Sequence, residues 1–476
     1  MNNLRKTKII ATIGPASNSP EILRELIAAG MNVARLNLSH GEYDDHRKLL
    51  RLIRDTADEV GKPIAIMIDT RGIEIRTGKL ENASVELISG DTFTLYADVR
   101  IGNRSGVSVS YRNLAAEVEP GTPILLDDGA IEMEVRSVTE DGIVCDIIHG
   151  GVLKESKSVN LPDTELASSA VSPEYKDDIM REITFAAEND VDYLAASFVQ
   201  SADDIHQIRK IFRGSDRQIP IIAKIENKAG IRNLDEIIQA ANGIMVARGD
   251  LGVELPLAEV PGFQKKIIRS TVLNGKPVIT ATEMLASMER NPKPTRAEAS
   301  DVANAILDGT SAVMLSGETA IGKFPVLAVK TMSDLAQRTE KSLREYGYLQ
   351  KIQMDPLNII PEVVSQSAVN MADQLNATAI FSLTETGFTS RLVSKNRPDC
   401  PILAVTYSKQ VVRRLCMNWG IFPLLYEGGN DDTAKLDFAV KQAVELGYIH
   451  PGDVVIVTAG FQQQAGSTDL IRVLTV

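Results

Sequence analysis

The sequence contains few of the residues that build disulfide frameworks, thiolate metal sites or membrane spans. It has three cysteines, Cys145, Cys400 and Cys416, which lie far apart and show neither pairing nor metal-ligand spacing. We expect buried thiols in a reducing compartment. No apolar run approaches the length of a membrane span, and the N-terminal stretch lacks a long apolar core, so we expect a cytoplasmic protein.

Basic residues are fewer than acidic residues. The chain has 51 Lys and Arg against 63 Asp and Glu, a net charge of −12. Such a surface does not attract nucleic acid or an anionic membrane, and we expect neither as a partner. Phosphorylated small molecules remain possible if basic residues gather in a pocket. The single Trp419 is expected to pack in a core, and His46, His149, His206 and His450 show no ligand spacing.

Short apolar runs alternate with helical patterns through most of the first 345 residues. Each run ends in polar residues, and a helical pattern follows it, which is typical of strand–helix units in a parallel sheet. Eight such steps predict a (β/α)₈ barrel. The expected strands are Lys8–Ile13, Val33–Leu38, Ile64–Ile68, Asp192–Val199, Pro220–Ile225, Gly243–Val246, Pro277–Thr280 and Ala312–Leu315.

Three of the expected helices are clear in the sequence. Ser19 and Pro20 should open a helix that closes at Gly30, as a cap residue followed by proline predicts. A single amphipathic helix is expected between the fifth and sixth strands, and another helix is expected at Arg296–Leu307.

Two further regions interrupt or follow the barrel pattern. Between residues 73 and 168 the apolar periodicity falls to two and turn residues separate short runs, which predicts an inserted all-β domain after the third strand. After a linker near Tyr346–Pro356, strands and helices alternate again, enough for a second α/β domain. We expect a barrel at 1–72 and 169–345, the insertion at 73–168 and a C-terminal domain at 356–476.

Charged residues gather at the carboxyl ends of the fifth and sixth expected strands. Lys224 and Glu226 end one strand, and Asp250 follows the next. The carboxyl ends of barrel strands face the ligand site. Two carboxylates with one Lys suit Mg²⁺ and a phosphorylated substrate, because Mg²⁺ takes few protein oxygens. The alternative is a structural Lys–Glu ion pair with Asp250 as a helix cap.

The other strand ends add cations, hydroxyls and oxygen ligands, without an obvious nucleophile–base couple. This composition favours phosphoryl transfer, whose catalysis is mostly positioning and charge neutralisation. The residues are Arg35, Asn37, Ser39, Asp69, Thr70, Thr280, Thr282, Ser316 and Glu318.

Long strings across nearly the whole chain resemble the pyruvate kinase family in that family's order. They are TKIIATIGPAS, MNVARLNLSHG, KIEN, GIMVARGDLGVELP, NPKPTRAEASDVANAILDG and VMLSGETAIGKFP. The resemblance implies a (β/α)₈ barrel, a β-domain acting as a lid and a C-terminal regulatory α/β domain, assembled as a homotetramer. It also implies phosphoryl transfer from phosphoenolpyruvate to ADP, the final step of glycolysis.

The resemblance assigns roles residue by residue. Glu226 and Asp250 would hold Mg²⁺ or Mn²⁺, and Lys224 would neutralise the phosphoryl group in transfer. The amides of Gly249 and Asp250 would receive the substrate carboxylate, as helix N-termini favour anions. Thr282 and Ser316 would lie near the enolate face, where a proton must be delivered. Contacts to phosphates and nucleotide are implied for Arg35, Arg76, Lys157, His40 and Asn37.

The same resemblance implies a monovalent-cation site. Its positions are matched by Asn37, Ser39, Asp69 and Thr70. Glu74 stands where family members without K⁺ dependence carry Lys, so we expect K⁺ activation.

Several positions depart from the family pattern. Arg71, Gly72 and Ile73 stand where Lys-Gly-Pro is usual before the lid, and losing the proline frees a backbone dihedral. Ser158 and Asp163 replace glycines near the lid's return, and Glu283 stands where Gln is common.

The C-terminal domain contains a loop that resembles the family's effector site. Hydroxyls and amides there could cradle a phosphate, while Glu385 would repel a second one. We expect a sugar monophosphate or AMP rather than a bisphosphate. An ordinary helix-start loop is the alternative. The expected effector residues are Thr384, Thr386, Gly387, Thr389, Gly466 and Ser467.

Two other functions stay open from the sequence. A Mg²⁺-dependent carbon–carbon lyase on a related barrel would share the Glu and Asp on adjacent strands, although the inserted β-domain argues against it. A silent sensor that kept its effector domain would be free to lose Lys224, Glu226, Asp250 and Thr282, all of which are present.

Overall fold

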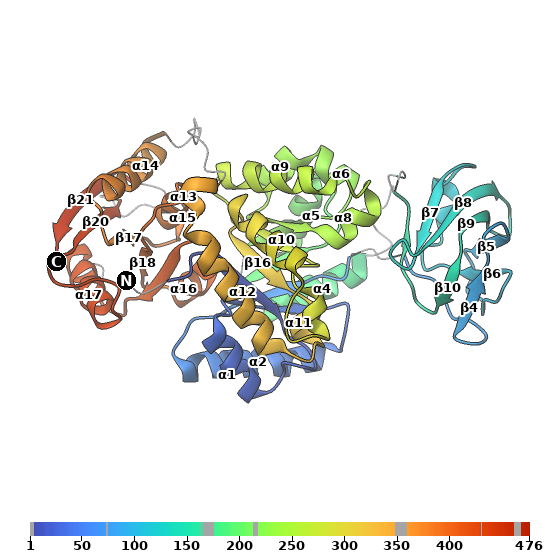
Figure 1. Ribbon diagram of the computed structural model, residues 1–476, viewed down its shortest axis with the longest axis horizontal. Coiled ribbons are helices and arrows are strands. Elements are labelled where there is room, and N and C mark those ends of the chain that lie inside the picture. The colour runs from blue at the N-terminus through green and yellow to red at the C-terminus, as the bar shows by residue number, and fades with distance from the viewer. Residues whose placement is uncertain are drawn as a thin grey trace.

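Eight parallel strands close into a barrel at the centre of the molecule (Figure 1). The computed structural model describes residues 4–72, 75–162, 164, 176–212, 218–347, 359–429, 431–460 and 468–476. The predicted barrel is confirmed, and its strand order is β1-β16-β15-β14-β13-β12-β3-β2. The strands are β1 Lys8–Thr12, β2 Val33–Asn37, β3 Ala65–Asp69, β12 Tyr193–Ala196, β13 Ile221–Ile225, β14 Gly243–Ala247, β15 Val278–Ala281 and β16 Ala312–Leu315.

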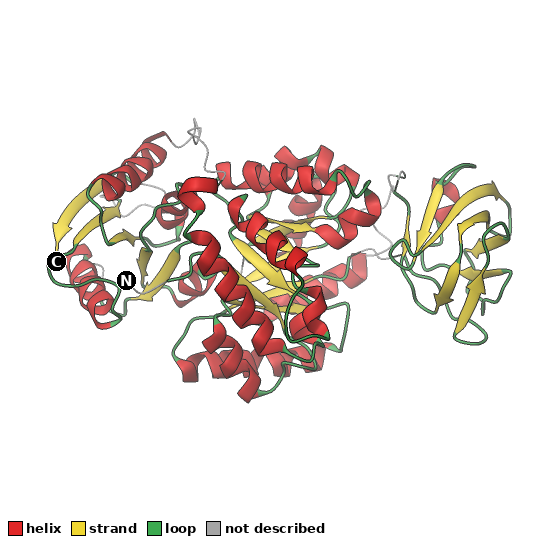
Figure 2. Cartoon of the chain, in the orientation of Figure 1, coloured by secondary structure: helices red, strands yellow, loops and turns green. Residues whose placement is uncertain are grey.

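Helices cover the outside of the barrel, and in Figure 2 they are the red coils above, below and in front of the central yellow strands. Helix α1 begins as the sequence predicts, with Ser19 accepting a hydrogen bond from the Ile22 amide and Pro20 in the first turn, and it ends at Gly30 with φ 119°. The helices are α1 Pro20–Ala29, α2 Tyr43–Val60, α4 Lys176–Glu188, α5 Ala202–Phe212, α6 Lys228–Arg232, α7 Leu234–Ala240, α8 Arg248–Glu254, α9 Val260–Leu273, α10 Arg296–Leu307, α11 Gly317–Ala320, α12 Pro325–Glu340 and α13 Leu343–Tyr346, with a 3₁₀ turn at Ala286–Glu289.

One expectation about these helices is wrong. The sequence predicts a single amphipathic helix between β13 and β14, but the chain forms α6 and α7 with a break at Asn233. The Asn233 backbone leaves helical geometry, and its side-chain amide donates to the Gln200 carbonyl at 2.8 Å. A short polar side chain that bonds outside its own helix competes with helix continuation.

The inserted β-domain lies at one end of the molecule and has its own core (Figure 1). It consists of a six-stranded sheet in the order β11-β7-β8-β9-β5-β6 and a two-stranded sheet, β10-β4. Burial alternates along β8, as a half-buried strand requires. The elements are β4 Ser84–Leu87, β5 Thr92–Tyr96, β6 Gly106–Ser108, α3 Leu114–Glu117, β7 Pro123–Leu126, β8 Ile131–Val138, β9 Ile143–His149, β10 Gly151–Lys154 and β11 Val159–Asn160.

The C-terminal domain contains a five-stranded sheet in the order β19-β18-β17-β20-β21, parallel except for the last strand. The predicted α/β architecture is confirmed. Its elements are α14 Ile359–Gln374, β17 Ala379–Leu383, α15 Phe388–Lys395, β18 Ile402–Thr406, α16 Lys409–Leu415, β19 Ile421–Leu425, α17 Asp432–Glu445, β20 Val454–Ala459 and β21 Leu470–Thr475.

This domain packs against the amino ends of the barrel strands. Lys8, at the start of β1, donates to the Ile421 carbonyl at 2.6 Å, and the Tyr193 hydroxyl, at the start of β12, donates to the Arg414 carbonyl at 2.6 Å. The inserted β-domain lies at the opposite end (Figure 1). The carboxyl ends of the strands therefore face away from the C-terminal domain.

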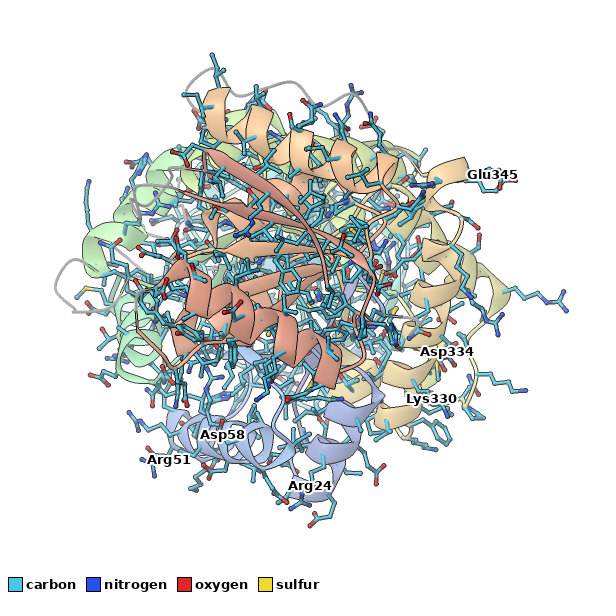
Figure 3. The ribbon with its side chains drawn as sticks, turned by 90° about the vertical axis from the view of Figure 1, so that its left-hand side faces the viewer. Arg24, Arg51, Asp58, Lys330, Asp334 and Glu345 are labelled. Carbon is cyan, nitrogen blue, oxygen red and sulfur yellow. The ribbon has the colours of Figure 1, made fainter. Side chains whose placement is uncertain are left out.

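Charge is concentrated on the outer faces of the helices. Viewed from the side of the C-terminal domain, Arg24, Arg51 and Lys330 point outward from α1, α2 and α12 (Figure 3). None of the helices in the described part of the chain is long and apolar enough to cross a membrane. The three cysteines are free and buried, as expected, and burial raises the pKa of each thiol to about 12.

Candidate active site

Lys224 lies at the centre of a buried charge cluster at the carboxyl end of β13. Its ammonium contacts Glu226 Oε1 at 2.8 Å and Asp69 Oδ1 at 3.1 Å. Burial disfavours the ammonium, but the carboxylates of Asp69, Glu226 and Asp250 outweigh burial and raise the pKa of Lys224. Lys224 is therefore a fixed positive charge at neutral pH.

Glu226 and Asp250 supply the carboxylates that the sequence predicts at this rim. Glu226 is 1% exposed, and its Oε2 accepts the Phe198 amide at 2.6 Å. Asp250 lies in the first turn of α8 and faces a cavity. The described residues contain no cluster of three or more His, Cys, Asp or Glu suited to a metal. Two carboxylates still fit Mg²⁺, which keeps several water or substrate ligands.

Arg35 and Asp69 join the first strands of the barrel to this cluster. Arg35 Nε donates to Asp69 Oδ2 at 2.7 Å, and Arg35 also donates to Thr12 Oγ1 at 3.0 Å. Burial opposes ionisation of Asp69, but Arg35 and Lys224 prevail and lower its pKa. Asn37 is paired with Asp69 in the β2–β3 register, and its Oδ1 accepts the Ser39 amide. The oxygens of Asn37 and Asp69 thus lie on adjacent strand ends.

Thr282 follows β15 in a backbone conformation that side-chain residues rarely adopt, with φ 62°. Its Oγ1 donates to the Ala281 carbonyl and accepts the Gly249 amide at 2.8 Å. Arg248, 9% exposed, donates to the Ala281 and Thr282 carbonyls and contacts Asp301 at 2.6 Å. These bonds hold the strained turn at the end of β15.

Ser316, after β16, has a buried hydroxyl with no hydrogen-bond partner among the described residues. Its amide donates to Glu318 Oε2 at 2.7 Å, and burial raises the pKa of Glu318. A buried hydroxyl without a protein partner is normally satisfied by water or a ligand. The Ser316 hydroxyl is therefore available to form a hydrogen bond with a water molecule or a ligand.

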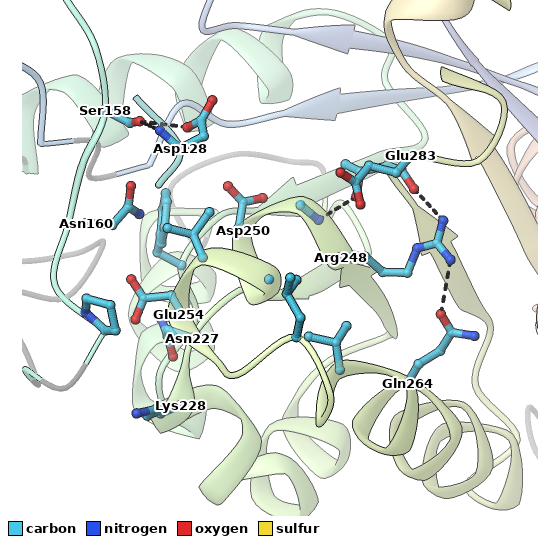
Figure 4. A pocket seen from close by; sticks show the side chains of 18 of the residues that line it. Asp128, Ser158, Asn160, Asn227, Lys228, Arg248, Asp250, Glu254, Gln264 and Glu283 are labelled. Atoms are coloured by element: carbon cyan, nitrogen blue, oxygen red, sulfur yellow. Dashed lines mark hydrogen bonds between the residues drawn. The ribbon is translucent and has the colours of Figure 1, made fainter. Parts of the chain in front are cut away.

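A cavity of about 1290 Å³ opens between the barrel and the inserted β-domain. The barrel contributes Arg248, Gly249, Asp250, Thr282 and Glu283, and Figure 4 shows Arg248, Asp250 and Glu283 around it. The β-domain contributes Arg76, Asp127, Asp128, Lys157, Ser158 and Asn160. Cationic side chains and carboxylates from the two domains thus face the same space.

The nucleotide-side predictions divide into two groups. Arg76 and Lys157 line this cavity, and Lys157 contacts Asp127 Oδ1 at 2.7 Å. His40 and Asn37 are outside the cavity lining in the described structure; His40 is exposed, and its carbonyl accepts from the His46 ring. Glu74, Ile73 and Asp163 lie outside the described residues.

The predicted effector loop forms the start of α15. Thr384 Oγ1 accepts the Gly387 amide at 2.9 Å, and Gly387 has φ 81°. Thr389 and Thr468 share a hydroxyl hydrogen bond of 2.7 Å, which joins this loop to the segment before β21. Thr386 is exposed. Gly466 and Ser467 lie outside the described residues.

Sequence reasoning missed Ser197, Phe198, Asp127 and Asp128. Ser197 and Phe198 follow β12, and the only indication in the sequence is a hydroxyl residue after a buried apolar run. Asp127 and Asp128 form a turn with φ 52° and 55°, and Asp128 accepts from the Ser158 hydroxyl at 2.6 Å (Figure 4).

The closed parallel barrel, with a charge cluster at its strand ends and Arg248 and Asp250 facing a cavity, defines a (β/α)₈-barrel protein of enzyme type. The family model described as "Pyruvate kinase, barrel domain" matches residues 4–329, and "Pyruvate kinase, alpha/beta domain" matches residues 362–474. The chain belongs to the pyruvate kinase family.

Curated relatives match the sequence over almost the whole chain. The chain is 46% identical to "Pyruvate kinase" of Geobacillus stearothermophilus over 473 residues, covering 98% of this chain and 80% of the relative. It is 44% identical to that of Bacillus licheniformis, covering 99% and 81%. With "Pyruvate kinase" of Clostridium acetobutylicum it shares 40% identity, covering 99% of this chain and 100% of the relative.

Proposed function

We propose that the protein transfers the phosphoryl group of phosphoenolpyruvate to ADP, forming pyruvate and ATP. Family membership supports this phosphotransferase activity. The observation that carries the proposal in the structure is Lys224, a permanently charged ammonium enclosed by Asp69, Glu226 and the charge of Asp250. Phosphoryl transfer needs this kind of positioned charge more than it needs a general base.

The donor set at this site fits a divalent cation held by Glu226 and Asp250, Mg²⁺ or Mn²⁺. When bound, that cation supplies positive charge beside the transferring oxygens. The positive charge of Lys224 partly balances the negative charges of Glu226 and Asp250 in this structure. Its ammonium is also the compact cation that neutralises the migrating phosphoryl group. Arg35, fixed by Asp69 and Thr12, adds a second positive charge to the same edge.

Thr282 and Ser316 are proposed to serve the other half of the reaction, protonation of the enolate carbon. Thr282 Oγ1 already links the Ala281 carbonyl to the Gly249 amide, so a substrate carboxylate at α8 would exchange with this hydroxyl as the amide's acceptor. The Ser316 hydroxyl, buried without a described partner, is suited to hold the water that delivers the proton.

We also propose a K⁺ site made of oxygens from Asn37, Ser39, Asp69 and Thr70. These are the hard oxygen donors that alkali cations require, and the pairing of Asn37 with Asp69 supports their proximity. A Lys at position 74 would supply a positive charge in place of K⁺. Because this chain has Glu74 there, we propose that it depends on K⁺.

Arg76 and Lys157 are proposed to bind the nucleotide phosphates, because both line the cavity between the barrel and the β-domain. Asn37 and His40 remain proposals from family resemblance.

The remaining proposals concern regulation and assembly. A sugar monophosphate or AMP would bind at the loop of Thr384, Thr386, Gly387 and Thr389, together with Gly466 and Ser467. The protein is proposed to be a cytoplasmic homotetramer. We propose the domain bounds 1–72 and 169–345, 73–168, and 356–476, with the inserted β-domain acting as a lid.

The test is pyruvate formation from phosphoenolpyruvate and ADP, followed with and without Mg²⁺, with and without K⁺, and after adding ribose 5-phosphate, AMP or fructose 1,6-bisphosphate. Lys224→Met should lower kcat by about 10³-fold or more, because it removes a charge acting on the transition state. The matched control is Lys8→Met, a second buried lysine at the opposite end of the barrel. It should keep kcat within about threefold of the parent value.

Two results would contradict the proposal. One is no turnover by folded protein under every condition, and the other is equal loss of activity in both lysine variants. Cleavage of a C4 dicarboxylate-like substrate in place of phosphoryl transfer would favour the lyase.

A further inference from the structure

The turn after β12 reaches the same ammonium that the proposed reaction depends on. Ser197 is 1% exposed, and its Oγ accepts from Lys224 Nζ at 2.7 Å. Its hydroxyl donates to the Thr70 carbonyl at 2.7 Å, and Asp69 Oδ1 lies farther away, at 3.3 Å. Ser197 is therefore the third acceptor around Lys224, beside Asp69 and Glu226.

The next residue contacts the proposed metal ligand. The Phe198 amide donates to Glu226 Oε2 at 2.6 Å, and Phe198 has φ 53°. A positive φ at a bulky residue costs about 1–3 kcal/mol and persists only where the surroundings enforce it. Here the strained backbone aims the amide at one carboxylate oxygen while Lys224 holds the other.

Gly72, on the segment that leads into the inserted β-domain, packs directly on this turn. It has φ 71°, and a Cβ at Gly72 would lie 2.7 Å from both the Phe198 ring and Ser197 Cβ. No room exists for a larger residue without moving the turn. The turn is thus fixed from the side of the β-domain as well as from the barrel.

We propose that the turn of Ser197 and Phe198 is a positioning element for phosphoryl transfer, in which the Ser197 hydroxyl holds Lys224 and the Phe198 amide orients Glu226. This inference rests on the proposed function and adds two residues that act through Lys224 and Glu226. It assigns a task to the fourth barrel strand, whose end carries no charged residue.

Two of the three acceptors around Lys224 are charged and one is neutral, and this difference explains why Ser197 is important for holding the ammonium in place. An ammonium has three N–H donors, and Lys224 has Asp69, Glu226 and Ser197 as acceptors. Carboxylates are attracted to any other cation that enters the site. Ser197 carries no charge, and its proton is committed to Thr70, so its lone pair stays directed at Lys224. Of the three acceptors, it is the one that a cation held by Glu226 and Asp250 would attract least.

The test compares Ser197→Ala and Ser197→Cys with a control, Ser311→Ala. Ser311 is also buried and accepts a barrel hydrogen bond, from the Val278 amide, but lies at the opposite ends of the strands. Ser197→Ala should lower kcat by about 10- to 100-fold, since a misplacement near 1 Å can cost that much. The KM for ADP should change by less than about threefold. Ser311→Ala should keep kcat near the parent value.

The cysteine variant separates positioning from packing. A thiol leaves no cavity in place of the hydroxyl, since sulfur is somewhat larger than oxygen, but it is a weak acceptor. Ser197→Cys should therefore stay within about threefold of Ser197→Ala in kcat. Parent-like kcat in either Ser197 variant, or an equal loss in the Ser311 control, would overturn the proposal.

A second readout does not depend on activity. In a crystal structure of Ser197→Ala, Lys224 Nζ should leave its present position between Asp69 and Glu226. An unmoved Nζ would refute the inference even if the parent protein catalysed a different reaction. Failure of the parent protein to form pyruvate would instead refute the proposed function, so the two failures are distinguishable.

Discussion

Glu182 should make the stability of the barrel fall as the pH rises from about 4.5 to about 7. This carboxyl on α4 is 3% exposed and accepts the Arg71 amide, 3.2 Å from Oε2. Burial raises its pKa from 4.5 to about 7, against the opposing effect of Arg71. The folded state therefore binds a proton that the unfolded chain has already lost.

Proton linkage gives the direction and the size of the change in folding stability that Glu182 causes. A carboxyl whose pKa is raised by folding stabilises the native state below about pH 4.5, and that contribution is lost as the pH rises to about 7. The difference between 4.5 and about 7 corresponds to about 3 kcal/mol. Glu182→Gln cannot ionise and keeps an oxygen for the Arg71 amide. It should therefore be more stable than the parent at pH 8 by up to about 3 kcal/mol, and nearly equal at pH 5.

Thermal unfolding between pH 5 and pH 8 measures this effect as the difference between variant and parent. The difference in midpoint should grow with pH to roughly 5 °C. The control Glu188→Gln changes an exposed carboxyl on the same helix and should leave the parent's slope intact. Parallel curves for Glu182→Gln and the parent would refute the reasoning.

Three other outcomes are expected. Asp192→Ala should cost about 3 kcal/mol, because it removes the buried carboxylate that Arg54 and Arg413 contact at 2.6 and 2.8 Å and leaves them the half-exposed Asp190; an unchanged thermal midpoint would contradict this. Thr295→Ala removes the capping box with Glu298 and should cost about 1 kcal/mol, seen as roughly fivefold faster hydrogen exchange in the first turn of α10 and nowhere else. The buried cysteines should react with a thiol reagent only after denaturant is added; rapid native labelling would contradict their burial.

The sequence predicts the barrel well because local patterns determine its elements. Helix α10 has the predicted bounds, Arg296–Leu307, and β16 has the predicted bounds, Ala312–Leu315. In both, an apolar pattern and its capping or turn residues lie within a few positions of one another. Lys224, Glu226 and Asp250 are found for a similar reason, since charges directly after buried strands are conspicuous.

What the sequence does not predict depends on contacts between distant segments. The break at Asn233 involves a bond to Gln200, and the role of Ser197 involves Lys224 and Thr70. Neither Asn233 nor Ser197 carries a charge that would mark it. Only closure of the barrel brings these groups within reach of their partners.

The C-terminal domain and the Lys224 cluster lie at opposite ends of the same short barrel strand, β12. Tyr193, the first residue of β12, is bonded to the Arg414 carbonyl, and the strand's last residue leads directly into Ser197. Four extended residues span about 13 Å and cannot shorten without breaking their ladders to β3 and β13. The Arg414 carbonyl and the Ser197 hydroxyl are therefore held at a fixed separation, one at each end of the same short strand.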